Sequence, residues 1–82
     1  MRKAINKKLN ITINVVEHIM TRNLWEFYIT DNKHDDDIVE ALVMGHETEL
    51  GDISINSIKP FISMRTYDMS GLLPPEGYEW VK

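Results

Sequence analysis

The feature that most constrains the fold is a pair of apolar runs separated by an acidic stretch. In the first run, Trp25, Phe27 and Ile29 alternate with more polar residues, and a period of two is typical of a strand with two different faces. The second run, residues 38–44, contains a single charge, Glu40. Because it is apolar on nearly both faces, it is expected to form a central strand that is covered on both sides.

Residues 31–37, which join these runs, have the composition of a turn. They contain Asn32 and three consecutive aspartates, and such side chains favour turns because they hydrogen-bond to their own backbone. The two runs are therefore expected to pair as an antiparallel hairpin. Gly45 marks a second turn, after which residues 50–55 are expected to form a third strand.

A short helical turn is expected after this third strand. Ser54 is a suitable N-cap residue, and three isoleucines follow at spacings of three and four: Ile55, Ile58 and Ile62. Pro60 limits the length of the helix because its ring clashes with the preceding turn.

The N-terminal part of the chain contains the most regular alternation. Apolar residues occupy every second position of residues 9–15, with Asn and Thr between them, which favours a strand that has one face in water. A helix over residues 5–20 is the alternative, since its apolar residues also have helical spacing; the strand is favoured because Asn and Thr are poor helix formers. The pair Val15-Val16 interrupts the alternation and indicates a β-bulge.

Residues 64–69 are expected to form a last edge strand, followed by a proline-containing loop, and Trp80 is expected to pack back on the body. These elements predict an α+β fold with a small antiparallel sheet of four or five strands, arranged as a meander with one or two short helical turns. The chain is expected to be a single domain over residues 1–82, with residues 1–8 as a flexible basic end.

Composition excludes several classes of protein. The chain has 82 residues and no cysteine, so disulfides, cysteine–zinc sites and a cysteine nucleophile are excluded. No apolar run approaches the ~20 residues of a membrane helix. We therefore expect a cytoplasmic protein with no membrane partner.

The charges are unevenly distributed, although the net charge is only −4. Residues 1–25 carry five basic residues against one acid, whereas residues 26–52 carry nine acids against one lysine. The acidic middle segment makes a nucleic-acid partner unexpected. It favours a basic protein partner, and its candidate binding residues are Asp35, Asp36, Asp37, Glu47, Glu49 and Asp52.

No motif in the sequence indicates a reaction. The four glycines are scattered, and no serine has the glycine frame of a nucleophile elbow, so no catalytic residue and no cofactor are predicted. The alternative is a small metal-binding protein or metal-assisted enzyme that uses carboxylates and histidines of the turns. Its candidate ligands are His34, Asp35, Asp37, His46 and Glu47.

Self-association is a further expectation. If the strand over residues 9–15 lies at a sheet edge, its unpaired backbone groups can pair with a second copy and form a homodimer. The basic segment 1–8 of one subunit would then meet the acidic turn 31–37 of the other.

Residues 25–54 resemble a family of small uncharacterised proteins of phages, plasmids and other mobile elements. The resemblance is carried by a W-x-x-Y strand at Trp25 and Tyr28, an acidic turn, and a G-x-E-x-E-L-G stretch that begins at Gly45 and is followed by Ser54. Asp52 stands where an aromatic residue is common in that family. The resemblance implies a small α+β protein of mobile-element origin, and it implies no particular activity. The acidic segment, the small size and the lack of a catalytic motif favour a non-catalytic interaction module, and we expect it to bind a host or phage protein.

Overall fold

The computed structural model describes all 82 residues of the chain, and its secondary structure is mostly β. Turns join most of the strands, but a helical connection links the fifth strand to the sixth and a longer loop precedes the seventh. The elements in chain order are β1 (Arg2–Asn6), β2 (Ile11–Thr21), β3 (Glu26–Lys33), β4 (Ile38–Met44), β5 (Thr48–Ser54), α1 (Ile55–Ile58), η1 (Lys59–Phe61), β6 (Ile62–Thr66) and β7 (Glu79–Trp80).

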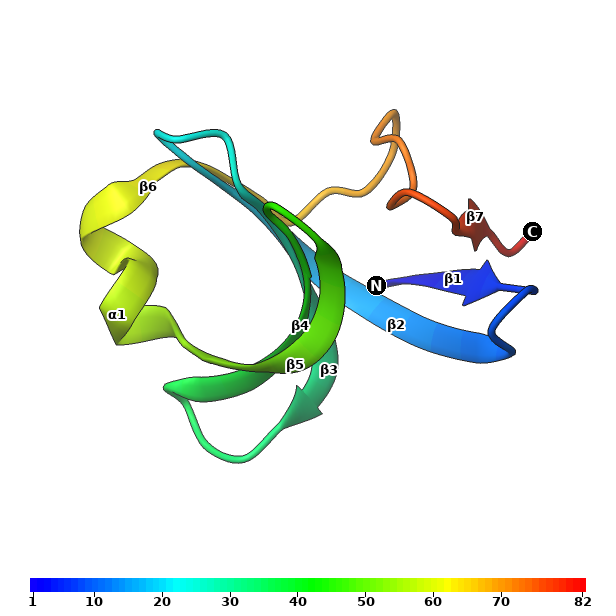
Figure 1. Cartoon of the computed structure of the whole chain (residues 1–82), viewed down its shortest axis with the longest axis horizontal. Helices are drawn as coiled ribbons and strands as arrows, with labels where there is room; N and C mark the ends of the chain where they lie inside the picture. The colour runs from blue at the N-terminus through cyan, green and yellow to red at the C-terminus, as the bar shows by residue number, and fades with distance from the viewer.

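The strands form one antiparallel sheet in the order β5-β4-β3-β2-β1-β7. Strand β2 is the centre of this sheet because it pairs with β3 on one side and with two strands on the other. Its N-terminal half pairs with β1, and its C-terminal half, from His18 to Thr21, pairs with β6. The sheet curls, and in Figure 1 the elements β4, β5, α1 and β6 together form a ring. The result is a small barrel that stays open, since β5 and β6 do not pair with each other.

A β-bulge in β2 changes which residues face each side of the sheet. The register with β3 shifts between Val15 and Glu17. Before the shift, Ile13 and Val15 pack in one apolar cluster; after it, Ile19 packs in the other. The expected strand and bulge are thereby confirmed, and the helix alternative is wrong. Leu9 lies in the turn before β2 rather than in the strand.

Apolar side chains bury both faces of the sheet. The interior cluster, inside the barrel, is centred on Ile19, Phe27, Ile29, Val39 and Ala41. The outer cluster, on the opposite face, consists of Ala4, Ile13, Val15, Tyr28, Leu42, Met69 and Tyr78. Strands β3 and β4 contribute alternate residues to both clusters. The expected alternation of β3 and the expected covering of β4 on both sides are confirmed.

The helical connection begins as the sequence indicates. Ser54 caps α1, its hydroxyl accepting a hydrogen bond from the Ser57 backbone N–H at 3.2 Å. Pro60 follows at the start of η1, where the α-helix has already ended. The three isoleucines of this region pack on the interior cluster: Ile55, Ile58 and Ile62. No helix in the chain has the length and apolar character needed to cross a bilayer.

The C-terminal segment covers the outer face of the sheet. Met69 and Tyr78 belong to the outer cluster, and Pro75 is fully buried. Trp80 lies opposite Ala4 of β1 and donates its indole N–H to the Leu72 carbonyl at 2.8 Å. The expectation that Trp80 packs back on the body is confirmed.

Three expectations about the sheet require correction. The sheet has seven strands rather than four or five, because both terminal segments add to it. Residues 2–6 of the expected flexible end form β1, in which Ala4 and Asn6 are buried. The strand that contains residues 11–15 is not an edge, because β2 has neighbours on both sides, and this removes the basis for a homodimer through it.

An ion pair joins β6 to the centre of the sheet. Arg65 donates from Nε to Oε2 of Glu17 at 2.5 Å and from Nη2 to Oε1 at 3.1 Å. The Glu17 side chain is only 8% exposed, so the ion pair with Arg65 offsets the cost of burying it. The hydrogen bond to Glu17 is also the main reason that the pKa of Arg65 is raised.

We predict that Arg65→Ala lowers the free energy of unfolding by about 2–3 kcal/mol, because it leaves the Glu17 carboxylate buried without its partner. The control is Lys7→Ala, which removes the exposed Lys7–Glu79 pair and should leave stability unchanged. Urea unfolding followed by circular dichroism measures both. Equal urea midpoints of unfolding for the two variants would contradict a structural role for the Arg65–Glu17 pair.

Candidate functional site

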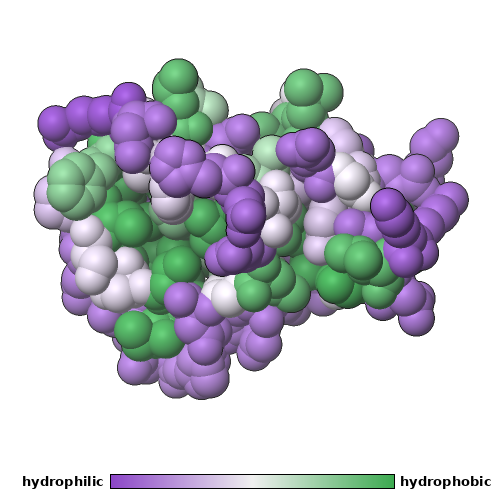
Figure 2. Space-filling model, in the orientation of Figure 1, coloured by the Kyte–Doolittle hydropathy of each residue, from purple (hydrophilic) through white to green (hydrophobic).

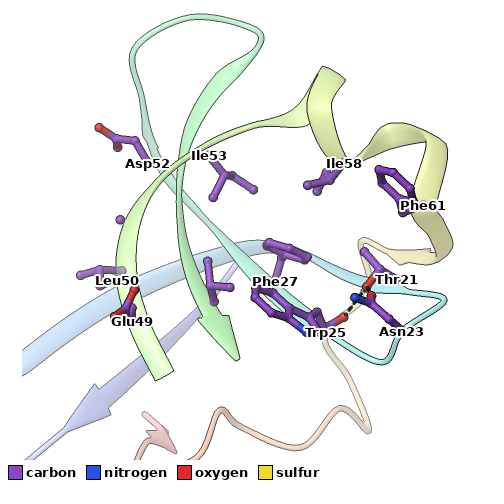
Figure 3. Close-up of a pocket in the computed structure, with 12 residues that line it drawn as sticks. Thr21, Asn23, Trp25, Phe27, Glu49, Leu50, Asp52, Ile53, Ile58 and Phe61 are labelled. Carbon is purple, nitrogen blue, oxygen red and sulfur yellow. Dashed lines mark hydrogen bonds between the residues drawn. The ribbon is translucent and has the colours of Figure 1, made fainter. Parts of the chain in front are cut away.

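The main candidate site is an apolar pocket at the open side of the barrel. It has a volume of about 540 Å³ and lies between β5 and the α1–η1 connection, with the β2–β3 turn at one end. In Figure 3, Ile53 and Ile58 point into the pocket from opposite sides, whereas Asp52 points away from it. The lining residues are Thr21, Asn23, Trp25, Phe27, Val43, Glu49, Leu50, Gly51, Asp52, Ile53, Ile58 and Phe61.

The pocket exists because the end strands of the barrel are not joined. β5 pairs only with β4, and β6 pairs only with β2, so the helical connection spans the remaining gap. Apolar side chains of the interior cluster are consequently accessible from this side. Figure 2 shows a hydrophobic hollow inside the ring of Figure 1, with hydrophilic residues around it. Apolar hollows of this size are common binding sites.

Trp25 forms one wall of the pocket, and its position depends on Gly45. A Cβ atom at residue 45 would lie 2.7 Å from three ring atoms of Trp25, which is too close for any side chain. The indole ring therefore lies directly against the backbone of the β4–β5 turn. It also meets His46 edge-on, with 5.6 Å between the ring centroids. The glycine thus fixes the wall of the pocket by allowing this close approach.

Acidic side chains flank the pocket. Glu49 and Asp52 belong to its lining, which contains no lysine or arginine. Glu47 lines a smaller hollow next to it, together with Trp25 and Glu49. Asp52 also hydrogen-bonds to Nε2 of His34 at 2.9 Å. The electrostatic potential at the mouth of the pocket is therefore expected to be negative.

The six acidic residues expected to bind a partner fall into three groups. Asp35 and Asp37 have structural roles. The Asp35 carboxylate accepts hydrogen bonds from the backbone N–H groups of Ile38 and Asp37, and these bonds lower its pKa. The Asp37 carboxylate accepts a hydrogen bond from the Ser54 hydroxyl at 3.0 Å, beside α1. Asp36 extends into solvent and meets only Lys33. The remaining three lie on β5 or the turn before it: Glu47, Glu49 and Asp52.

The residues considered for a metal site are not brought together. His34 and Asp35 precede β4, whereas His46 and Glu47 follow it, so the two groups lie at opposite ends of this strand. No group of three or more His, Asp or Glu side chains is arranged to hold a metal ion. The turns therefore supply no coordination sphere for the metal alternative.

A buried polar cluster on the outer face was not identified from the sequence. His18 Nε2 lies 2.9 Å from Oε1 of Glu26, and the rings of His18 and Tyr28 are 4.7 Å apart. Tyr28 donates its hydroxyl to the Leu73 carbonyl at 3.2 Å. Burial, and then the charge of Glu26, raises the pKa of Tyr28 to about 12. These contacts attach the C-terminal segment to the sheet, which gives the cluster a structural role.

The apolar residues of the pocket were also missed, because they come from distant segments. Ile58 and Phe61 approach from the helical connection, whereas Phe27 comes from β3 and Val43 from β4. The local signal that could have indicated the site is Gly51, since a glycine inside a strand often marks a close approach of another chain or ligand.

We predict that Gly45→Ala displaces Trp25 and lowers the free energy of unfolding by about 1–3 kcal/mol, as overpacking of a well-filled site does. The matched control is Gly51→Ala, whose Cβ would meet nothing within 4 Å. It should keep or slightly raise stability. Urea unfolding and the chemical shift of the Trp25 indole N–H report the two effects. An unmoved indole resonance in Gly45→Ala would show that the ring does not rest on this turn.

Comparison of the chain with protein-family models, with curated proteins and with solved structures finds no match. The fold and the pocket therefore carry the argument about function.

Proposed function

We propose that the protein is a non-catalytic protein-interaction module that binds a basic partner through the apolar pocket and the acidic residues around it. The observation that carries this proposal is the combination, at one place, of an open apolar pocket with carboxylates and without lysine or arginine in the lining. Neither feature alone distinguishes a binding site from ordinary surface.

The two features support different parts of binding. Apolar surface that leaves water contributes most of the affinity, and side chains such as Phe61, which is 58% exposed, have such surface to bury. Carboxylates at the rim raise the rate of encounter with a positively charged partner and disfavour acidic competitors. Glu49 and Asp52 are placed for this because they lie on β5 in the lining of the pocket, and Glu47 lies in the turn just before β5, beside the neighbouring hollow.

The resemblance of residues 25–54 to proteins of mobile elements gives the proposal a setting. The partner would be a host or phage protein in the cytoplasm. Most of the basic residues of the N-terminal part lie in β1 or in the turn between β1 and β2. Because β1 and β5 lie near opposite ends of the sheet, these residues do not neutralise the acidic face, which consists of Asp36, Glu47, Glu49 and Asp52.

Affinity capture from host lysate tests the proposal, with the wild-type protein compared with a variant that carries Asp36→Asn, Glu47→Gln, Glu49→Gln and Asp52→Asn. Asp35 and Asp37 stay unchanged because they hold the β3–β4 loop and α1. We expect proteins that the wild type retains to be lost from the variant, and to elute from the wild type as salt screens the charges.

The control is Glu79→Gln, which removes an acid from β7 at the opposite end of the sheet and should not alter capture. Equal recovery of every protein by the wild type and the four-residue variant would contradict the role of the acidic face.

A further inference from the structure

We infer that β5 binds its partner by strand addition: an extended basic segment pairs with the free edge of β5 and inserts a large apolar side chain opposite Gly51. This inference rests on the proposed function and names the chemistry of the partner. Three independent features of the structure support it.

The first feature is the unpaired edge itself. Every residue of β5 is in register with β4, from Thr48 opposite Met44 to Ser54 opposite Ile38, and no other strand pairs with β5. Backbone hydrogen bonds outside the regular elements do not involve residues 48–54 either. In an antiparallel edge strand, alternate N–H and C=O groups point away from the sheet, where they can pair with an added strand.

The second feature is Gly51, in the middle of this edge. A Cβ atom built on Gly51 would meet nothing within 4 Å, so the glycine is not required by packing inside the chain. It belongs to the lining of the pocket, in which Ile53 points inward two residues later. A residue opposite Gly51 on an added strand would find this space free. Large side chains, aromatic ones in particular, compensate for a glycine on a neighbouring strand in this way.

The third feature is the pattern of charge around the glycine. Glu49 lies two residues before Gly51, on the same strand face, and Asp52 follows on the opposite face. An added antiparallel strand would therefore place one residue opposite Asp52, the next opposite Gly51 and a third, two positions further, opposite Glu49. Opposite charges on facing strands attract each other. The sequence of the added segment is therefore expected to be a basic residue, a large apolar residue, any residue and a second basic residue.

A second copy of this chain fits the edge poorly. Pairing of two antiparallel β5 strands with Gly51 opposite Gly51 would leave both glycines without a facing side chain, and none of the acids Glu47, Glu49 and Asp52 would face a basic residue. A basic segment with a large apolar residue supplies what a second copy lacks, namely a side chain opposite Gly51 and positive charges opposite Glu49 and Asp52.

The probe for the test is the peptide acetyl-Thr-Lys-Lys-Phe-Lys-Lys-Thr-amide, whose symmetric sequence suits either strand direction. NMR titration of the ¹⁵N-labelled protein is expected to shift the amides of residues 48–54 and the Trp25 indole N–H. Replacing Phe by Ala in the peptide is expected to raise Kd by about tenfold or more. On the protein, Gly51→Leu fills the same space and should weaken binding by a similar factor.

Two N-methylated peptides make the test specific for strand pairing. One carries the methyl group on the Phe nitrogen and the other on the nitrogen of the next Lys. Because only alternate N–H groups of an added strand point toward β5, one peptide should bind about tenfold more weakly and the other almost as well as the parent. Equal affinities for the two peptides would overturn strand addition, whether or not Gly51→Leu folds.

Two further results would also overturn the inference. One is binding of N-acetyl-phenylalanine amide as tightly as the peptide, which would make the pocket a site for a single side chain or small molecule. The other is concentration-dependent shifts of residues 48–54 without peptide, which would assign the edge to a second copy. If strand addition fails while the four-residue neutral variant still loses its captured proteins, the acidic face remains the binding surface and only the mode of pairing is wrong.

Discussion

The structure depends on the way that β2 divides its hydrogen bonds between two strands on one side. Its N-terminal half holds β1 and its C-terminal half holds β6, while β3 pairs along the other side. The bulge between Val15 and Glu17 makes this division compatible with packing, because it moves Ile19 into the barrel interior while Ile13 stays on the outer face. The Glu17–Arg65 pair then fastens β6 to the same strand.

This arrangement leaves the barrel without a closing pair of strands. The connection from β5 to β6 is a helical turn that packs isoleucines on the interior cluster instead of bringing the two edges together. The remaining opening holds the pocket, and Gly51 lies at its edge without a side chain to cover it. The proposed binding at this site would therefore complete both the apolar core and the backbone hydrogen bonds of β5. A chain of this size buries a limited fraction of its surface, so both gains are significant for it.

Local patterns allowed much of the fold to be predicted. The alternation around Phe27, the double-sided β4, the bulge at Val15-Val16 and the Ser54 cap were all anticipated, because each depends on neighbouring residues. The return of β6 to β2 was not anticipated, and neither was the addition of β1 and β7, since nothing in a short window specifies which strands meet.

The candidate site was predicted only in part for the same reason. Glu49 and Asp52 do flank the pocket, but Asp37 turned out to hold Ser54 and the start of α1, a contact between segments seventeen residues apart. The apolar wall could not be foreseen, because Trp25 and Phe61 face one space only after the sheet has curled. The mobile-element resemblance remains a proposal about origin and partner.

Native-state hydrogen exchange of the free protein at low concentration tests the open edge of β5 most directly. We expect alternation along residues 48–54, with slow exchange of the amides that face β4 and rapid exchange of the intervening amides. The amides of β2 that bond to its neighbours on either side are expected to exchange slowly. Uniform slow exchange over residues 48–54 would contradict the account, because it would mean that both sides of β5 are already paired.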